Sequence, residues 1–358
     1  MNVSPRLAVR FEQEIFAQPD VWDAIATSDH AARLARAIDS EVLFVGSGSS
    51  LFAAQLGAVA LRRHGVRAQA LATTETRLDH NAYAGCVVVA LSQSGRSTDL
   101  LDALDVLAPR RLVALTNTVD SPLGRRADVA IDIGAGDEVT VSASKSLTAT
   151  AAIVLWAASL VAGDRLRTAL MLAETADAVR SWLMSDEVAS VIAAGTELGS
   201  KSNVVVLGSA YGLPIARECA FKLKEASYLH AEGFAAGEFR HGSIAMVDDS
   251  YGGVAIVDDA THDVVARSLR ECAAAGARCF SVGNRPTDDD VPRLGPRVDE
   301  SFNALAWLVT TQLLALHAGR SRKIESDAPR VLKKALVASP DNGSVGWPIP
   351  PVLGSDRT

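Results

Sequence analysis

The chain has 358 residues, of which 48 % are hydrophobic and 22 % charged, and its formal net charge is −7. These values predict a globular protein of about two domains. The negative charge argues against non-specific nucleic-acid binding, whereas a phosphorylated small molecule stays compatible because backbone N–H groups and hydroxyls can hold phosphate.

No stretch of the sequence has the properties of a secretory signal or a membrane span. The N-terminus carries charges such as Arg6 and Glu12 instead of an apolar core. The longest apolar run, residues 147–162, is shorter than the ~20 residues of a membrane helix and is expected to be a buried helix. We therefore expect a cytoplasmic protein without membrane contact.

The cysteines show no CxxC motif and no paired metal-ligand spacing. They are expected to be reduced and mostly buried thiols. They are Cys86, Cys219, Cys272 and Cys279. No metal and no cofactor are predicted.

In the first half, short apolar runs alternate with helical periodicity after a helical start at residues 1–40. This alternation predicts a parallel sheet covered by helices on both faces. The expected strands are residues 41–45, 66–71, 86–91, 111–115 and 129–133, and the expected helices include 51–64 and 99–107.

The second half repeats this order at a nearly constant offset, with expected strands at residues 204–207, 253–257 and 278–282. Such spacing favours tandem duplication. We predict an α/β fold of two doubly wound domains with parallel sheets. The expected division is an N-terminal helical segment at 1–40, a first domain at 41–163, a linker helix at 164–190, a second domain at 191–338 and a tail at 339–358.

Two loops of the first half are rich in hydroxyls, and each follows an expected strand and enters a helix. They supply Ser47, Ser49 and Ser50, and then Ser92, Gln93, Ser94, Ser97 and Thr98. Hydroxyls and free N–H groups at the carboxyl edge of a parallel sheet form an anion site. The alternative is that serine and glycine only turn the chain and cap helices. Nucleotide binding is not favoured, because GSGSS at residues 46–50 lacks the third glycine of G-x-G-x-x-G and no Walker lysine is present.

Residues 218–242 carry a candidate acid/base pair. Lys222 and Glu225 stand three residues apart, a spacing that places both on one helical face. His241 follows after a glycine-containing turn, and these three side-chain types together can move protons at one point. An amphipathic surface helix with an ordinary salt bridge is the simpler interpretation of the pair alone.

Three other polar groups have simple structural interpretations. Lys145 either reaches a ligand or is solvated, and the solvated state is favoured. His230 and Glu232 lack a third ligand at fixed spacing, which favours a core or interface histidine over a metal site. Lys333 and Lys334 are expected at a solvated surface unless one of them is drawn into a site.

Together these motifs resemble the SIS (sugar isomerase) domain family, and most closely the isomerase half of glucosamine-6-phosphate synthase, the glutamine–fructose-6-phosphate amidotransferase. The similarity covers about residues 20–340 and rests on SQSG at 92–95, KLKEASYLHAEGFAAGEFRHG at 222–242 and PRVLKK at 329–334. It implies two tandem SIS domains, a sugar-phosphate substrate bound in the first domain, and a homodimer.

The resemblance also implies a role for each matching residue. Glu225 would move a proton between C1 and C2 of the sugar, with Lys222 assisting. His241 of the neighbouring subunit would open the ring, and Lys334 would form a Schiff base with the keto-sugar. The implied phosphate ligands are Ser49, Ser50, Ser92, Gln93, Ser94 and Ser97, and the implied sugar contacts are Ser47 and Val141.

Departures from the family pattern put the substrate in question. The N-terminal glutaminase domain of the family is expected to be absent, since Asn2 stands where its nucleophilic cysteine would be. Ser243 replaces the proline after HG, and Ala143 replaces the serine of the VAST-K motif. The second half has no SQSG, and Asp258 and Asp259 stand near that place, so one sugar site per chain is expected.

The expected enzyme is a phosphosugar isomerase and deaminase acting on a ketose or amino-sugar 6-phosphate. Its reaction would resemble the deamination of glucosamine 6-phosphate to fructose 6-phosphate. A fructosamine-6-phosphate deglycase that uses the same Schiff-base lysine is a close alternative. A sugar-phosphate sensor without turnover is a further one, against which the retained Glu225, His241 and Lys334 argue.

Overall fold

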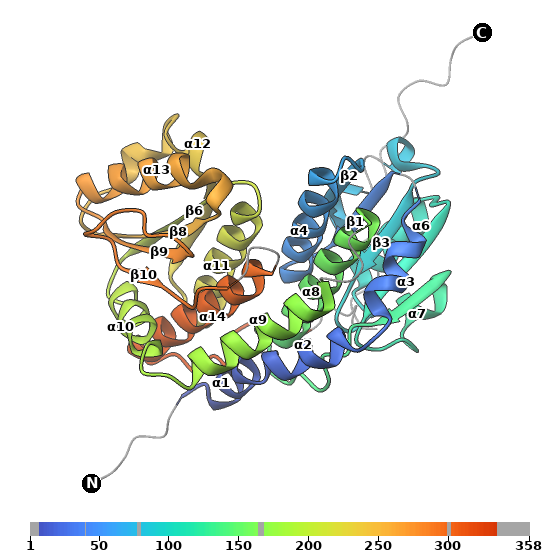
Figure 1. Ribbon diagram of the computed structural model, residues 1–358, viewed down its shortest axis with the longest axis horizontal. Helices are drawn as coiled ribbons and strands as arrows, with labels where there is room; N and C mark the ends of the chain where they lie inside the picture. The colour runs from blue at the N-terminus through green and yellow to red at the C-terminus, as the bar shows by residue number, and fades with distance from the viewer. Residues whose placement is uncertain (1–6, 40, 77–79, 164–167, 299–301, 335–358) are drawn as a thin grey trace.

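The protein contains two α/β units that lie side by side, each built on a five-stranded parallel sheet (Figure 1). The computed structural model describes residues 7–39, 41–76, 80–163, 168–298 and 302–334. The predicted α/β class with parallel sheets is confirmed. The predicted tail, residues 339–358, and Asn2 lie outside the described residues, and the predicted domain boundaries stay predictions.

The first sheet has the strand order β2-β1-β3-β4-β5, so the chain winds one way from β1 to β2 and the other way from β3 onward. The strands are β1 (Val42–Gly46), β2 (Ala68–Ala72), β3 (Val87–Leu91), β4 (Arg111–Thr116) and β5 (Val129–Asp132). All five expected strands are present, and β2 begins two residues later than expected. Alternate residues of β1 pack into separate core clusters on the two faces of the sheet, Phe44 in one and Leu43 in the other.

Helices cover both faces of this sheet, which is why its strands are almost continuously apolar. They are α4 (Ser49–Arg63), α5 (Thr73–Thr76), α6 (Thr98–Val106), α7 (Pro122–Arg126) and α8 (Lys145–Val161). The apolar run that forms α8 is buried along most of its length, as predicted. Within the described residues, no helix combines the length and apolarity that crossing a membrane requires.

The second sheet has the order β10-β9-β8-β6-β7, which is the same winding repeated. Its strands are β6 (Asn203–Gly208), β7 (His230–Ala235), β8 (Tyr251–Val257), β9 (Arg278–Gly283) and β10 (Arg293–Leu294). Its helices include α11 (Gly212–Ser227), α12 (Ala236–Phe239), α13 (His262–Ala274) and the buried α14 (Asn303–Ser321). The predicted internal repeat is therefore present. Strand β7 was not expected, because it lies at a sheet edge and its sequence HAEGFA has mostly exposed and half-buried positions.

Helices α1 (Val9–Phe16), α2 (Gln18–Ala26) and α9 (Thr168–Leu183) run between the two units along one side of the molecule (Figure 1). Helix α3 (His30–Ala37) packs on α8 of the first unit, and α10 (Val188–Leu198) packs on α14 of the second. Helix α2 packs on α8 and α9, with Trp22 fully buried, while α1 packs on α14. The start of α1 is held by Asp327, which accepts hydrogen bonds of 2.8 Å from the backbone N–H groups of Arg10 and Phe11.

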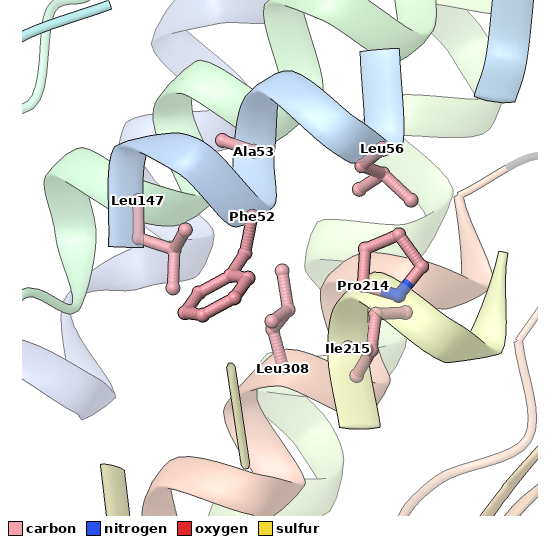
Figure 2. A pocket seen from close by; sticks show the side chains of 7 residues that line it. All are labelled: Phe52, Ala53, Leu56, Leu147, Pro214, Ile215 and Leu308. Carbon is pink, nitrogen blue, oxygen red and sulfur yellow. The ribbon is translucent and has the colours of Figure 1, made fainter. Parts of the chain in front are cut away.

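The two units meet where α4 faces α11 (Figure 1). A small apolar cavity of about 10 Å³ lies at this junction. Phe52 lies in the first turn of α4 and Leu147 in the first turn of α8, and both point toward the cavity beside Ile215 of α11 (Figure 2). The beginnings of α4 and α8 are thereby brought against α11.

Candidate functional site

A buried lysine between two carboxylates on α11 forms the centre of the candidate site. Glu218, Lys222 and Glu225 share one face of the helix, because their spacings are four and three residues. Lys222 Nζ lies 3.2 Å from Glu218 Oε1 and 2.6 Å from Glu225 Oε2. The side chain of Lys222 is completely inaccessible to solvent, so an ordinary surface salt bridge was the wrong interpretation of the pair.

This cluster is joined to the first unit by Ser49. The Ser49 hydroxyl accepts a hydrogen bond of 2.9 Å from Lys222 Nζ and donates one of 3.1 Å to Glu218 Oε1. Ser49 is the first residue of α4, directly after the Gly/Ser loop. Its side chain therefore links the hydroxyl loop to the acid/base cluster, and its role as a phosphate ligand stays a prediction.

The charges of the cluster are set by burial. Burial raises the pKa of Glu218 to about 7, because Lys222 and Ser49 only partly offset the cost of burying a carboxylate and the charge of Glu225 adds to it. Burial alone would lower the pKa of Lys222, but the two flanking carboxylates raise it above its ordinary value. Lys222 is thus a fixed cation. A ligand can reach Glu225, whose side chain is 12 % exposed.

The two hydroxyl loops come together at the carboxyl edge of the first sheet. They follow β1 and β3, which are neighbours in the sheet and lie where the winding changes direction. In open α/β sheets this is the place where ligands bind. The structure therefore places the predicted candidates in these two neighbouring loops and at the helix starts that follow them: Ser47, Ser50, Ser92, Gln93, Ser94 and Ser97.

The second of these loops has a tightly determined shape. Ser92 Oγ accepts a hydrogen bond of 3.1 Å from the N–H of Gly95, and Ser94 Oγ accepts one of 3.2 Å from the N–H of Arg96. Each hydroxyl keeps its proton to donate to an anion. Gly95 has φ +60°, and a Cβ there would lie 1.9 Å from Ser121 Oγ, so only glycine fits.

The equivalent position in the second sheet carries charged and aromatic side chains instead of a hydroxyl loop. Its winding changes between β6 and β8, and Asp258 follows β8. Arg63, at the end of α4, places Nη1 3.7 Å from Asp258 Oδ2 and stacks its guanidinium 4.6 Å from the ring centre of Tyr211. A carboxylate covered by an arginine does not suit a phosphate, which supports the prediction of one sugar site per chain.

Lys334 lies against the first unit. Its Nζ is 3.0 Å from Glu138 Oε2 and donates a hydrogen bond of 2.6 Å to the carbonyl of Thr140. Half-buried Val141 follows Thr140 in the same loop, so the structure brings these two predicted site residues together. Within the described ranges, no hydrogen bond or ion pair joins Lys334 to the pair on α11. Lys145, expected to be solvated, is half-buried and donates its Nζ to the carbonyl of Asp137.

The histidines of this region are both exposed. His241 follows α12, and its side chain makes no hydrogen bond or ion pair with any other residue that the structure describes. His230 lies on the edge strand β7 with its ring 3.1 Å from the Asn203 side chain, so its expected burial in the core is wrong. The interface alternative for His230 stays a prediction.

Two buried carboxylates of the site region were not predicted. Glu218 could have been found, because it stands four residues before Lys222 on the same helical face. Glu138 gave no such signal, because its partner Lys334 is 196 residues away in the sequence. All four cysteines are buried and unpaired, as predicted.

Comparisons with known proteins agree with this architecture. A family model described as SIS domain matches residues 26–160 and 197–291. The glutamine–fructose-6-phosphate aminotransferase [isomerizing] of Sulfurisphaera tokodaii is 30 % identical over 299 residues, which are 82 % of this chain and 49 % of that protein. The chain thus spans about half the length of the curated relatives it matches.

Solved structures share the fold. The C-terminal domain of glucosamine-fructose-6-phosphate aminotransferase from Francisella tularensis has a TM-score of 0.78 at 24 % identity, covering 88 % of this chain and 97 % of that one. Glucosamine-6-phosphate deaminase from Thermotoga maritima has a TM-score of 0.75 at 21 % identity, covering 92 % and 100 %. The matched SIS segments span more than half of the chain and contain β1 to β5 and β6 to β9, so the protein belongs to the SIS domain family, with two SIS domains in tandem.

Proposed function

We propose that this protein is a phosphosugar isomerase that converts glucosamine 6-phosphate to fructose 6-phosphate with release of ammonia. One observation carries the proposal: Glu225 is hydrogen-bonded to a buried, charged Lys222, and Ser49 joins this pair to the hydroxyl loops. The names of the relatives, an isomerizing aminotransferase and a glucosamine-6-phosphate deaminase, support the substrate class.

In this proposal the sugar phosphate is held by neutral groups. The loops after β1 and β3 offer the hydroxyls of Ser50, Ser92, Ser94 and Ser97 next to the starts of α4 and α6. Hydroxyls and N–H groups at helix starts favour a dianion without a lysine or arginine in contact with it. The 6-phosphate would then orient the sugar so that its C1–C2 edge faces Glu225.

Glu225 would act as the proton carrier. It takes the proton from C2 of the open-chain amino sugar and returns it to C1. Together with the loss of one proton from the amine and the gain of one by O1, this converts the aldose with a C2 amine into a ketose imine. Lys222 stabilises the Glu225 carboxylate before the first transfer and after the second, because it is a fixed cation 2.6 Å away. The C2 nitrogen then leaves as ammonia when another amine takes its place at C2.

Two groups complete the scheme. Lys334 would replace ammonia at C2 by forming its own imine with the keto-sugar, which water then hydrolyses to fructose 6-phosphate. His241 would open the sugar ring from the neighbouring subunit of a homodimer. Its exposure and its lack of side-chain partners within the described residues are compatible with a role at a site built by two chains.

The test is a direct assay with glucosamine 6-phosphate in which ammonia and fructose 6-phosphate are measured separately. Equal amounts of both products are expected. Glu225→Gln should lower kcat by at least about a hundredfold, because Gln cannot carry the proton. The matched control is Glu232→Gln, an exposed carboxylate on β7 that should leave kcat unchanged. Glucosamine without phosphate should not react.

Each other outcome selects a different function. Interconversion of ketose and aldose phosphates without ammonia release would indicate a plain isomerase. Amine release from a fructosamine 6-phosphate, with glucosamine 6-phosphate inert, would indicate a deglycase. Binding of sugar phosphates without turnover would indicate a sensor, and the enzymatic proposal would then be abandoned.

A further inference from the structure

Glu138 is a buried carboxylate with an unusually complete set of donors. Its side chain is inaccessible to solvent, and it accepts hydrogen bonds from the backbone N–H groups of Ser144 and Ser146 at 2.9 and 3.0 Å. The Ser146 hydroxyl donates at 2.6 Å, and Lys334 Nζ lies at 3.0 Å. No other carboxylate that the structure describes contacts Lys334.

The donors keep this carboxylate charged. Burial would raise the pKa of Glu138, but the charge of Lys334 and the hydrogen bonds from Ser146 and Ser144 outweigh it and hold the value below its ordinary range. Glu138 also faces the start of α8, where the helix dipole favours an anion. Glu138 is therefore charged when Lys334 is in contact with it.

The loop that carries Glu138 is braced from a second direction. Glu14 on α1 accepts a hydrogen bond of 2.5 Å from the N–H of Val139, and the Thr140 hydroxyl also donates to it. The start of α1 is in turn held by Asp327. A chain of polar contacts thus runs from the segment after α14, through α1, to the loop that receives Lys334.

Little else holds the last four described residues of that segment, 331–334. The side chains just before Lys334 gain almost nothing from burial, because Val331 is 96 % exposed, Leu332 is 44 % exposed and Lys333 is exposed as well. Lys334 itself is 27 % exposed. Its position is consequently set by the Glu138 carboxylate and the Thr140 carbonyl instead of by apolar packing.

This anchor stands close to the reaction centre of the proposed function. Leu147, one residue beyond the Ser146 that Glu138 binds, lines the same apolar cavity as Phe52 and Ile215 (Figure 2). Phe52 lies three residues after Ser49, and Ile215 lies three residues before Glu218, which is one helical turn in each case. The start of α8 therefore adjoins both the hydroxyl loop and the acid/base cluster.

We propose that Glu138 is a positioning residue that anchors Lys334, and with it the end of the C-terminal segment, at the sugar-phosphate site. This inference rests on the proposed function, in which Lys334 forms the Schiff base. A fixed anion shortens the search of a flexible lysine for the carbonyl carbon, because it raises the local concentration of the amine. The proton that the ammonium must lose before it attacks goes to solvent, which the partial exposure of Lys334 allows.

The experiment compares Glu138→Gln, which keeps the shape and removes the charge, with Glu138→Asp, which keeps the charge on a shorter side chain. The control is Asp137→Asn, an exposed neighbour of the same kind. Borohydride trapping with fructose 6-phosphate, read as the mass of the Lys334 peptide, measures imine formation. Hydrogen–deuterium exchange over residues 325–334 measures docking without any chemistry.

We expect Glu138→Gln to slow trapping and kcat by at least roughly tenfold, with the Kd of fructose 6-phosphate changed less than twofold. Exchange in residues 328–334 should accelerate. Glu138→Asp should recover part of both effects, and it serves alone if the Gln variant does not fold. Asp137→Asn should behave as wild type.

Two results distinguish a failure of the anchoring role from a failure of the proposed function. Trapping and exchange at wild-type rates in folded Glu138→Gln would overturn the anchoring role, whatever the enzyme's reaction. Absence of a Lys334 adduct in the wild-type enzyme during turnover would overturn the Schiff-base part of the proposed function and the catalytic purpose of the anchor. If hydrogen–deuterium exchange in residues 328–334 still depended on Glu138 in that case, the contact between Glu138 and Lys334 would have only a structural role.

Discussion

Glu218 is the single residue whose charge state the fold alters most clearly. It is fully buried, and its second oxygen, Oε2, has no hydrogen-bond partner among the described residues. Its pKa is raised from 4.5 to about 7. The native protein therefore binds a proton at this site more tightly than the unfolded chain does, and stability contributed by the group is complete below about pH 4.5 and lost as the pH rises through 7.

Glu218→Gln removes this proton equilibrium while keeping the side-chain volume. Between pH 5 and pH 8 the free energy of unfolding of wild type should fall relative to the variant by up to about 3 kcal/mol. Urea unfolding at four pH values measures the free energy of unfolding of each protein. The slope of this free energy with pH is then compared between wild type and Glu218→Gln. The exposed Glu238→Gln provides the control. Parallel curves for wild type and Glu218→Gln would contradict the proposed titration.

At the scale of an element, the loop after β3 depends on one glycine. Gly95→Ala combines a left-handed backbone with a Cβ 1.9 Å from Ser121 Oγ, so we expect a loss of about 2–4 kcal/mol in stability and a much weaker affinity for sugar phosphate. Gly136→Ala is the matched control, because Gly136 has φ +63° but no atom lies within 4 Å of the place its Cβ would occupy. Similar losses in the two variants would show that crowding at Ser121 is unimportant.

Helix α1 gives a prediction of the same scale. Its first N–H groups are satisfied by Asp327, which is more than 300 residues away in the sequence. Asp327→Ala should cost about 1–2 kcal/mol and accelerate amide exchange in the first turn of α1. Asp327→Asn keeps an acceptor oxygen and should lose less. Equal amide exchange in wild type and both variants would show that Asp327 does not cap α1.

At the scale of the whole molecule, the proposed site requires two chains. A His241→Ala chain and a Glu225→Gln chain should each be inactive alone, since each lacks one group of every composite site. Mixed dimers should regain activity, because one of their two sites contains both groups. Assays on mixed dimers isolated with two different affinity tags measure this rescue, and its absence would place His241 outside the partner's site.

The sequence permitted the prediction of features whose cause is local. Strand β3 was predicted because a strand buried on both faces has an unbroken apolar run, and Lys222 with Glu225 because their spacing puts them on one helical face. The contacts that complete the site join distant positions. Ser49 and Glu218 are 169 residues apart, and no periodicity in either segment encodes their meeting. The edge strand β7 was missed because its burial pattern has no clear alternation.

The hydroxyl of Ser49 has a consequence for how the protein unfolds. Lys222 is an ion fully withdrawn from water in the second SIS domain, and one of its three partners belongs to the first. A second domain that lost its neighbour would expose the face of α11, including Ile215, and would lose the hydrogen bonds to Ser49, both of which are unfavourable. The two domains are therefore expected to melt in one calorimetric transition, with equal van't Hoff and calorimetric enthalpies, despite their separate sheets.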